Sequence, residues 1–199
     1  MALKAGTSPS GYFSTFARLF GQVEITSRDG RSLSVDDGMT AAIDLVLSLK
    51  GGRGKAMVIG NGGSAAIASH LHNDLSKAVG VRAMVFNESP LLTALANDDG
   101  YHTVFHTPLK LWADRGDVLI AVSSSGESES IVCAAQLCAE RGCRVLTFTG
   151  FKPGNRLRQL GDVNVYVPSG EYGFVEMAHS VIGHCMTDLA IMRMAAAHV

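Results

Sequence analysis

The chain has 199 residues, of which 47% are hydrophobic, and its formal net charge at pH 7 is −1. This length and apolar content are typical of one α/β domain with a full hydrophobic core. The nearly balanced charge provides no broad field that would attract nucleic acid or an anionic membrane, so we expect neither as a partner. A binding site for an anion would have to be local and made of backbone N–H groups, hydroxyls and helix N-termini.

Cysteine usage and the apolar segments favour a cytoplasmic protein. Residues 1–12 lack the apolar centre of a signal peptide, and no apolar run reaches the roughly 20 residues that span a bilayer. The cysteines form no CxxC pair and have apolar surroundings, which is typical of reduced, buried thiols. They are Cys133, Cys138, Cys143 and Cys185.

In chain order, the first predicted elements are two helices. Aromatic residues that begin at Phe13 recur at the spacing of one helix face. Residues 27–30 (SRDG) predict a turn, and Ser34, followed by two aspartates, resembles the capped start of a second helix that runs to residue 49. We expect residues 1–50 to form an N-terminal helical segment that packs on the main domain and on partner subunits.

From residue 55 onward, short apolar runs alternate with helical stretches. This alternation predicts a mainly parallel five-stranded sheet with helices on both faces, a three-layer α/β/α sandwich over residues 51–199. In such sheets ligands bind outside the carboxyl ends of the strands. The predicted strands cover residues 55–59, 82–86, 117–122, 143–148 and 162–167. The predicted helices cover residues 65–78, 90–96, 101–112, 128–141 and 172–197.

The first candidate binding loop is GNGGS at residues 60–64, between a predicted strand and a predicted helix. Its glycines allow a sharp turn and a close approach of the backbone to a ligand. The serine could either cap the helix or donate its hydroxyl to an anion. Glycine-rich turns also have purely structural roles, so this loop alone leaves both interpretations open. As a ligand site it would supply Asn61, Gly62, Gly63 and Ser64.

The second candidate loop is SSSGES at residues 123–128, directly after the predicted strand DVLIAV. A helix cap would use one or two of these serines, but not all of them. Hydroxyls gathered at the start of a helix suit the oxygens of a phosphate, so we favour an anion site. Neither loop has the Walker A or GxGxxG pattern, which argues for a small phosphorylated ligand over a nucleotide. The serines are Ser123, Ser124, Ser125 and Ser128.

Two predicted helices each carry a histidine and a carboxylate. His70 and Asp74 are four residues apart and share a helix face. Glu176 and His184 are eight residues apart and can border one cleft. Side chains of these types can bind a metal ion or transfer protons. A single histidine beside apolar residues is more often a core or surface group, which is our interpretation of His72, His102, His106 and His198.

Considered together, these motifs resemble those of the phosphoheptose isomerase family of SIS-domain proteins, and the resemblance runs from about residue 45 to residue 192. The segments GNGGS, LANDDGY (residues 95–101), GDVLIAVSSSGES, RVLTFTG and EMAHSVIGH occur in the family's order. The resemblance implies an SIS-type fold. It also implies interconversion of sedoheptulose 7-phosphate and D-glycero-D-manno-heptose 7-phosphate, zinc as a cofactor, and a homotetramer with active sites between subunits.

The resemblance also implies roles for individual residues. The serine loop and Ser64 would hold the phosphate, and Asn61 and Asp98 would contact the sugar. His184 would be catalytic and bind the metal ion, and Asp74 falls at the position of the family's catalytic glutamate. The implied metal ligands are His70, Asp74, Glu176 and His184, and Glu176 would also contact the substrate.

Several positions depart from the family's pattern. Asp74 replaces a glutamate, and Glu176 replaces a metal-binding glutamine. A substrate-contacting aspartate falls at Gly173, and a substrate-contacting arginine falls at Ala78 or its neighbour Lys77. Aspartate reaches about one methylene less far than glutamate, and a misplacement near 1 Å can cost on the order of 10²-fold in rate.

The expected reaction is aldose–ketose isomerisation through an enediol. Asp74 would move a proton between C1 and C2, His184 would act as the acid toward the oxygen, and zinc would polarise the carbonyl. One alternative is a non-catalytic SIS protein that binds a sugar phosphate or a partner protein, similar to a replication-initiator regulator. Another is an isomerase or sensor of a different phosphosugar. Because all four positions carry a side chain that can bind metal, we favour an enzyme.

Overall fold

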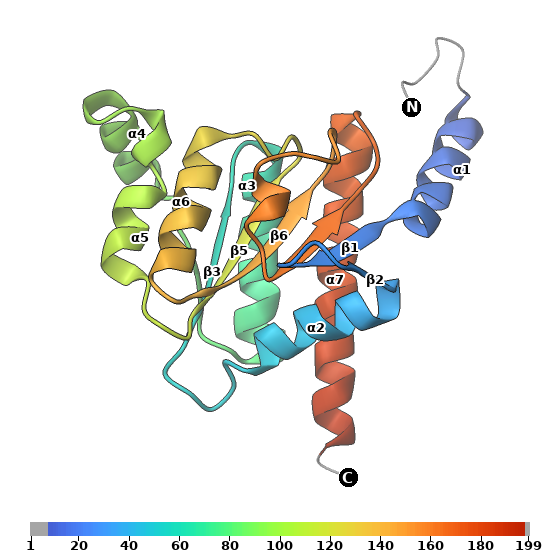
Figure 1. Ribbon diagram of the computed structural model, residues 1–199, viewed down its shortest axis with the longest axis horizontal. Coiled ribbons are helices and arrows are strands. Elements are labelled where there is room, and N and C mark those ends of the chain that lie inside the picture. The colour runs from blue at the N-terminus through green and yellow to red at the C-terminus, as the bar shows by residue number, and fades with distance from the viewer. Residues whose placement is uncertain (1–7, 198–199) are drawn as a thin grey trace.

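The computed structural model describes residues 8–197, so His198 and residues 1–7 lie outside it. In the described part of the chain one sheet of seven strands runs in the order β2-β1-β7-β6-β5-β3-β4 (Figure 1). The strands are β1 (Glu24–Ser27), β2 (Ser32–Leu33), β3 (Ala56–Gly60), β4 (Ala83–Val85), β5 (Val118–Ser123), β6 (Arg144–Thr149) and β7 (Val163–Tyr166).

The central strands are parallel, as the alternating pattern predicts. All five expected strands are present as β3 to β7, and every pairing among them is parallel. Each residue of β3, β5 and β7 is buried. Burial on both faces explains why β3 and β5 appear in the sequence as nearly continuous apolar runs.

Residues 24–33 contain the turn predicted at residues 27–30, but the expectation that the rest of this range is helical is wrong. They form a hairpin of β1 and β2, and β1 pairs antiparallel with β7, which raises the strand count from the predicted five to seven. Ile25 is fully buried, and the turn contains Gly30 at a φ of 79°, a conformation that favours glycine. Strands this short show no clear alternation, and the pairing of β1 with β7 is a tertiary effect.

Helices cover both faces of the sheet, which confirms the three-layer sandwich (Figure 1). Neighbouring residues of β3 point to opposite faces. Val58 joins a core with α2, α3 and α7, whereas Met57 joins a second core with α5 and α6. The α-helices of the described residues are α1 (Pro9–Leu19), α2 (Val35–Leu47), α3 (Gly63–Asp74), α4 (Ser89–Asp98), α5 (His106–Trp112), α6 (Glu129–Glu140) and α7 (Tyr172–Ala196).

The helix expected over residues 101–112 is interrupted. It consists of a short 3₁₀ helix, η3 (Tyr101–Thr103), followed by α5. Pro108 lies in the first turn of α5, where its ring would clash with the carbonyl of Val104 if one helix continued through both. The helix expected over 65–78 likewise divides into α3 and a π-helical turn, η2 (Leu75–Val79).

The N-terminal helices pack on the long helix α7. The Tyr12 ring of α1 lies 4.5 Å from the Phe174 ring of α7, measured between centroids. α2 begins as predicted, because the Ser34 hydroxyl accepts a 3.0 Å hydrogen bond from the backbone N–H of Asp37. No helix in residues 8–197 has the length and apolar content needed to cross a membrane.

The sheet order places a ligand crevice between β3 and β5. β4 follows β3 in the chain and lies on one side of it, whereas β5, the next strand, lies on the other side. The connections therefore diverge at the carboxyl ends of β3 and β5. In parallel α/β sheets this switch point is where ligands bind, and both candidate loops are located here.

Candidate functional site

The GNGGS loop turns sharply from β3 into α3. A Cβ on Gly60 would lie 2.4 Å from the backbone oxygen of Ser64, so only glycine fits there. Gly62, at a φ of 54°, adopts a conformation that side chains disfavour. The amide of Asn61 is fixed, because it donates to the Ser130 hydroxyl at 3.0 Å and accepts from the Tyr101 hydroxyl at 2.8 Å.

The serine loop turns from β5 into α6. Gly126 has a φ of 66°, and a Cβ there would lie 1.9 Å from Oδ1 of Asn155, so the turn requires glycine. Ser128 occupies the N-cap position of α6, yet its side chain makes no capping hydrogen bond. The Ser124 side chain is 4% exposed, and its hydroxyl has no hydrogen-bond partner in the described residues. A buried hydroxyl without a partner is costly unless a ligand supplies one.

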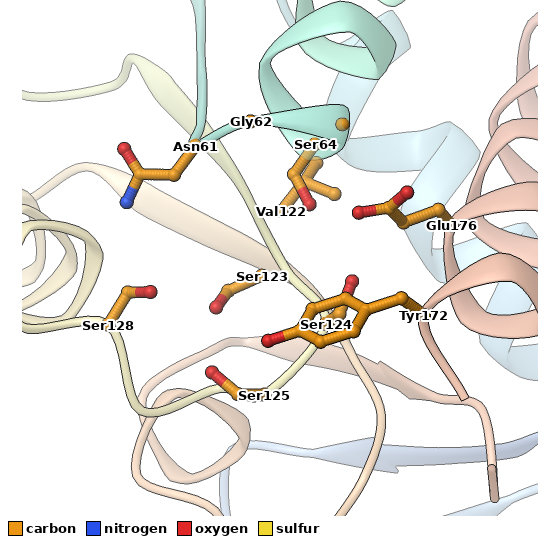
Figure 2. Close-up of a pocket in the computed structure, with 11 residues that line it drawn as sticks. Asn61, Gly62, Ser64, Val122, Ser123, Ser124, Ser125, Ser128, Tyr172 and Glu176 are labelled. Carbon is orange, nitrogen blue, oxygen red and sulfur yellow. The ribbon is translucent and has the colours of Figure 1, made fainter. Parts of the chain in front are cut away.

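The two loops and the first turns of α7 enclose a cavity of about 340 Å³ (Figure 2). Among the residues that the structure describes, the lining is made almost entirely of neutral hydrogen-bonding groups, with one carboxylate and no lysine or arginine. The structure therefore brings together all of the serines that were predicted to bind phosphate. The cavity is lined by Asn61, Gly62, Gly63, Ser64, Val122, Ser123, Ser124, Ser125, Ser128, Tyr172 and Glu176.

One predicted sugar contact does not reach this cavity within the chain. Asp98 lies at the exposed end of α4 and accepts a hydrogen bond from its neighbour Asn97. Its segment approaches the site through Tyr101 instead, which contacts Asn61. Asp98, which the resemblance assigns to the sugar, is not among the described residues that line the cavity.

Glu176 and Tyr172 are both presented to the cavity by α7. They are four residues apart and so share a helix face. The Glu176 carboxylate lies over the loop so closely that a Cβ on Gly63 would be 2.4 Å from Oε2. Sequence reasoning missed Tyr172, although its spacing from Glu176 is a signal that could have found it.

The predicted metal ligands divide into two places. His70, Asp74 and His184 come together, with ligand atoms within 4.8 Å of one another. Oδ2 of Asp74 lies 3.4 Å from Nε2 of His70 and 3.4 Å from Nδ1 of His184. Glu176 is absent from this group and lines the cavity, so the expected set of four ligands is not assembled within the described residues. The cause is distance, since eight residues of helix between Glu176 and His184 extend about 12 Å.

This three-residue group, His70, Asp74 and His184, lies on the outer surface of α3 and α7. The side chains of His70 and His184 are 56% and 47% exposed, and their rings meet edge to face at 4.7 Å. A small hollow beside them, lined also by Ser180, is separate from the serine-lined cavity. Within one chain, the candidate catalytic groups and the candidate phosphate site thus border different hollows.

His179 is a buried residue whose place sequence reasoning did not identify. It is 1% exposed, its Nε2 lies 3.0 Å from the carbonyl oxygen of Thr149, and its Nδ1 has no partner in the described residues. Burial lowers the pKa of His179 to about 4, so the neutral ring donates from Nε2. This bond joins α7 to the end of β6 one turn after Glu176, and so fixes how α7 meets the cavity.

Gly173, at the position of the family's aspartate, has a structural explanation. A Cβ there would lie 3.1 Å from the Tyr12 hydroxyl of α1. The Tyr12 ring packs against Phe174 at an interplanar angle of 35°, and this contact holds α1 against the start of α7. The missing side chain therefore makes room for α1 to pack beside the site.

The doubly wound sheet and the serine-lined cavity at its switch point define an SIS-domain protein, and the SIS domain family model matches residues 17–150. A phosphoheptose isomerase from Geobacter metallireducens is 36% identical over 151 residues, which cover 73% of this chain and 79% of the relative. The phosphoheptose isomerase from Pelobacter propionicus is 36% identical over 172 residues, 83% of this chain and 88% of the relative. The chain belongs to the phosphoheptose isomerase family of SIS-domain proteins.

Solved structures agree with this assignment. The structure of phosphoheptose isomerase from Neisseria gonorrhoeae matches with a TM-score of 0.78 at 26% identity and covers 91% of this chain and 95% of that one. A phosphoheptose isomerase from Francisella tularensis gives the same TM-score, 0.78, at 22% identity, which supports the fold.

Proposed function

We propose that this protein is an aldose–ketose isomerase that interconverts sedoheptulose 7-phosphate and D-glycero-D-manno-heptose 7-phosphate. The observation that carries the proposal is the cavity at the switch point, where the buried Ser124 hydroxyl has no partner in the described residues. A phosphate oxygen would supply that partner. The names of relatives that align over most of the chain support the choice of a seven-carbon sugar.

The phosphate is held by neutral donors in this proposal. Hydroxyls of the serine loop, the Ser64 hydroxyl and the N-termini of α3 and α6 surround the cavity. Helix N-termini carry a partial positive charge that favours an anion. Binding energy from the phosphate, far from the reacting carbons, can then be used to orient the sugar.

His70, Asp74 and His184 are the proposed catalytic and metal-binding residues. Asp74 transfers the proton between C1 and C2, and His184 donates to and accepts from the neighbouring oxygen. Two imidazoles and a carboxylate with an open position are the donor set of catalytic zinc sites, so the residues present fit zinc. When bound, zinc would stabilise negative charge on the sugar oxygen.

We also propose a homotetramer in which the active sites lie between subunits. Met177, Val181 and Met192 are 56%, 43% and 65% exposed and lie on the same face of α7 as His184. An exposed apolar stripe of this kind favours a partner surface. Assembly would let the cavity of one chain face the His70, Asp74 and His184 group of another, which a single chain keeps apart.

The four free cysteines support a cytoplasmic location.

The direct test is turnover of sedoheptulose 7-phosphate by the purified protein with and without added zinc. We expect activity in the wild type and a loss of at least about 10²-fold in kcat for Asp74→Asn, because general acid–base groups contribute roughly this much. Asp36→Asn, an exposed aspartate in the first turn of α2, is the matched control and should keep full activity.

Other results of this assay would support one of the alternative functions. Turnover of a different sugar phosphate, with none of sedoheptulose 7-phosphate, would indicate an isomerase of another phosphosugar. Absence of both turnover and sugar-phosphate binding would indicate a non-catalytic SIS protein. Full activity of Asp74→Asn would disprove the proposed role of that carboxylate.

A further inference from the structure

Tyr172 presents a phenol hydroxyl to the serine loop. It is the first residue of α7, it lines the cavity, and it is 61% exposed. Figure 2 shows its ring reaching from α7 toward the loop, with the hydroxyl directed toward Ser123 and Ser125. The hydroxyl thus faces the cavity, where a bound ligand could accept a hydrogen bond from it.

The ring of Phe151 packs against the ring of Tyr172. The two ring centroids are 4.8 Å apart at an interplanar angle of 73°, an edge-to-face contact. Phe151 directly follows Gly150 in the connection that leaves β6. Contact with a second aromatic ring limits the directions in which an exposed tyrosine can point.

The backbone at Phe151 is strained. Its φ of 58° makes it the one non-glycine residue of the described chain in the left-handed region. Two hydrogen bonds hold it there: its N–H donates to the Ser169 carbonyl at 2.8 Å, and its carbonyl accepts from the Tyr166 hydroxyl at 2.9 Å. Such strain persists only where surrounding structure enforces it, and it gathers at functional sites. Here it directs an aromatic ring against a cavity-lining side chain.

We infer that Tyr172 is a further phosphate-binding residue and that Phe151 is the positioning residue that aims it. This inference rests on the proposed phosphosugar site. A phosphate needs several donors, and no lysine or arginine of residues 8–197 lines the cavity to supply them. Tyr172 adds a hydroxyl donor on the α7 side, which the serine loop does not cover, and its ring shields the bound phosphate from water.

Titration with inorganic phosphate tests the role of Tyr172 without requiring turnover. The full chain is titrated at a fixed protein concentration, and Kd is measured for the wild type, Tyr172→Phe and Tyr172→Ala. Loss of the hydroxyl in Tyr172→Phe should raise Kd about tenfold, equivalent to about 1.4 kcal/mol, and Tyr172→Ala should raise it at least as much. Trp112→Phe, an exposed aromatic at the end of α5, is the matched control and should leave Kd unchanged.

A double-mutant cycle tests the role of Phe151. Phe151→Ala should raise the phosphate Kd, and Phe151→Tyr, which keeps the ring, should restore it. If Phe151 acts through Tyr172, the double variant Phe151→Ala with Tyr172→Ala should bind no more weakly than Tyr172→Ala alone. Phe151→Gly removes the ring but suits the left-handed backbone, so it gives the same test if the alanine variant does not fold.

Three results would overturn the inference. They are an unchanged Kd in Tyr172→Phe and Tyr172→Ala, additive losses in the double variant, or no phosphate binding by the wild type. Turnover of sedoheptulose 7-phosphate, measured in parallel, shows whether a negative result counts against Tyr172 or against the proposed isomerase function. If the wild type turns over the substrate and Tyr172→Phe is fully active with an unchanged KM, the role of Tyr172 is rejected but the isomerase proposal is not. Tyr172-dependent phosphate binding without turnover would reject the isomerase proposal alone.

Discussion

Acidification should destabilise the fold through His179. The ring is fully buried against β6, and burial lowers its pKa from 6.5 to about 4. The folded state therefore rejects a proton that the unfolded chain accepts below pH 6.5. The resulting stability is present in full above pH 6.5 and is lost as the pH falls toward 4.

The magnitude follows from the two pKa values. Their difference of about 2.5 units corresponds to about 3.4 kcal/mol when the pH has fallen below both. Between pH 7.5 and pH 5.0 the same linkage gives a loss of about 2 kcal/mol in the free energy of unfolding. That loss is a large fraction of the stability of an ordinary domain.

Urea unfolding at pH 7.5 and pH 5.0, with protein concentration held constant, measures this loss. The comparison needs His179→Gln, which removes the titrating group, and His102→Gln, which removes an exposed histidine as the matched control. We expect His179→Gln to be less stable at pH 7.5 but to lose about 2 kcal/mol less than the wild type on acidification. An equal pH dependence in the wild type and His179→Gln would refute the reasoning.

Three further predictions concern the loops and the sheet. Ser124→Ala should weaken binding of inorganic phosphate about tenfold in a calorimetric titration, because a hydrogen bond to a charged group contributes roughly 1.5–3 kcal/mol; an unchanged Kd would mean that phosphate does not contact Ser124. Gly126→Ala should lower the free energy of unfolding by more than about 2 kcal/mol, since its Cβ would lie 1.9 Å from Asn155 Oδ1 at a φ of 66°, and a wild-type urea midpoint would contradict this. Lys55→Met should cost about 3–5 kcal/mol in urea unfolding, because Lys55 Nζ pairs at 2.6 Å with Asp117, which is 1% exposed; a loss under about 1 kcal/mol would show that the pair is not needed.

The parts of the fold that follow local rules could be predicted from the sequence. β3 and β5 are buried on both faces, so their apolar runs are nearly continuous, and glycine and serine mark the turns at their ends. The β1–β2 hairpin could not be predicted, because both strands are short and β1 is stabilised by pairing with β7, far away in the chain. Pro108 could have predicted the break before α5, because a proline ring clashes with the carbonyl four residues earlier in a continuous helix.

The site shows the same division. Both loops are adjacent to strand ends, so the switch-point rule brings their side chains together, and the cavity lining follows. The meeting of His70, Asp74 and His184 depends on how α3 packs on α7, which spacing within each helix does not determine. Glu176 was grouped with them by resemblance, but its place one turn from the start of α7 puts it over Gly63 instead. Tyr172 and Phe151 are brought together from different connections, and no local pattern signals that contact.

The most direct test of the central claim is a crystal structure of the protein with sedoheptulose 7-phosphate. We predict that the phosphate lies between residues 61–64 and residues 123–128, with an oxygen within hydrogen-bond distance of the Ser124 hydroxyl. A sugar phosphate bound at another place, with the serine-lined cavity filled only by water, would contradict the account.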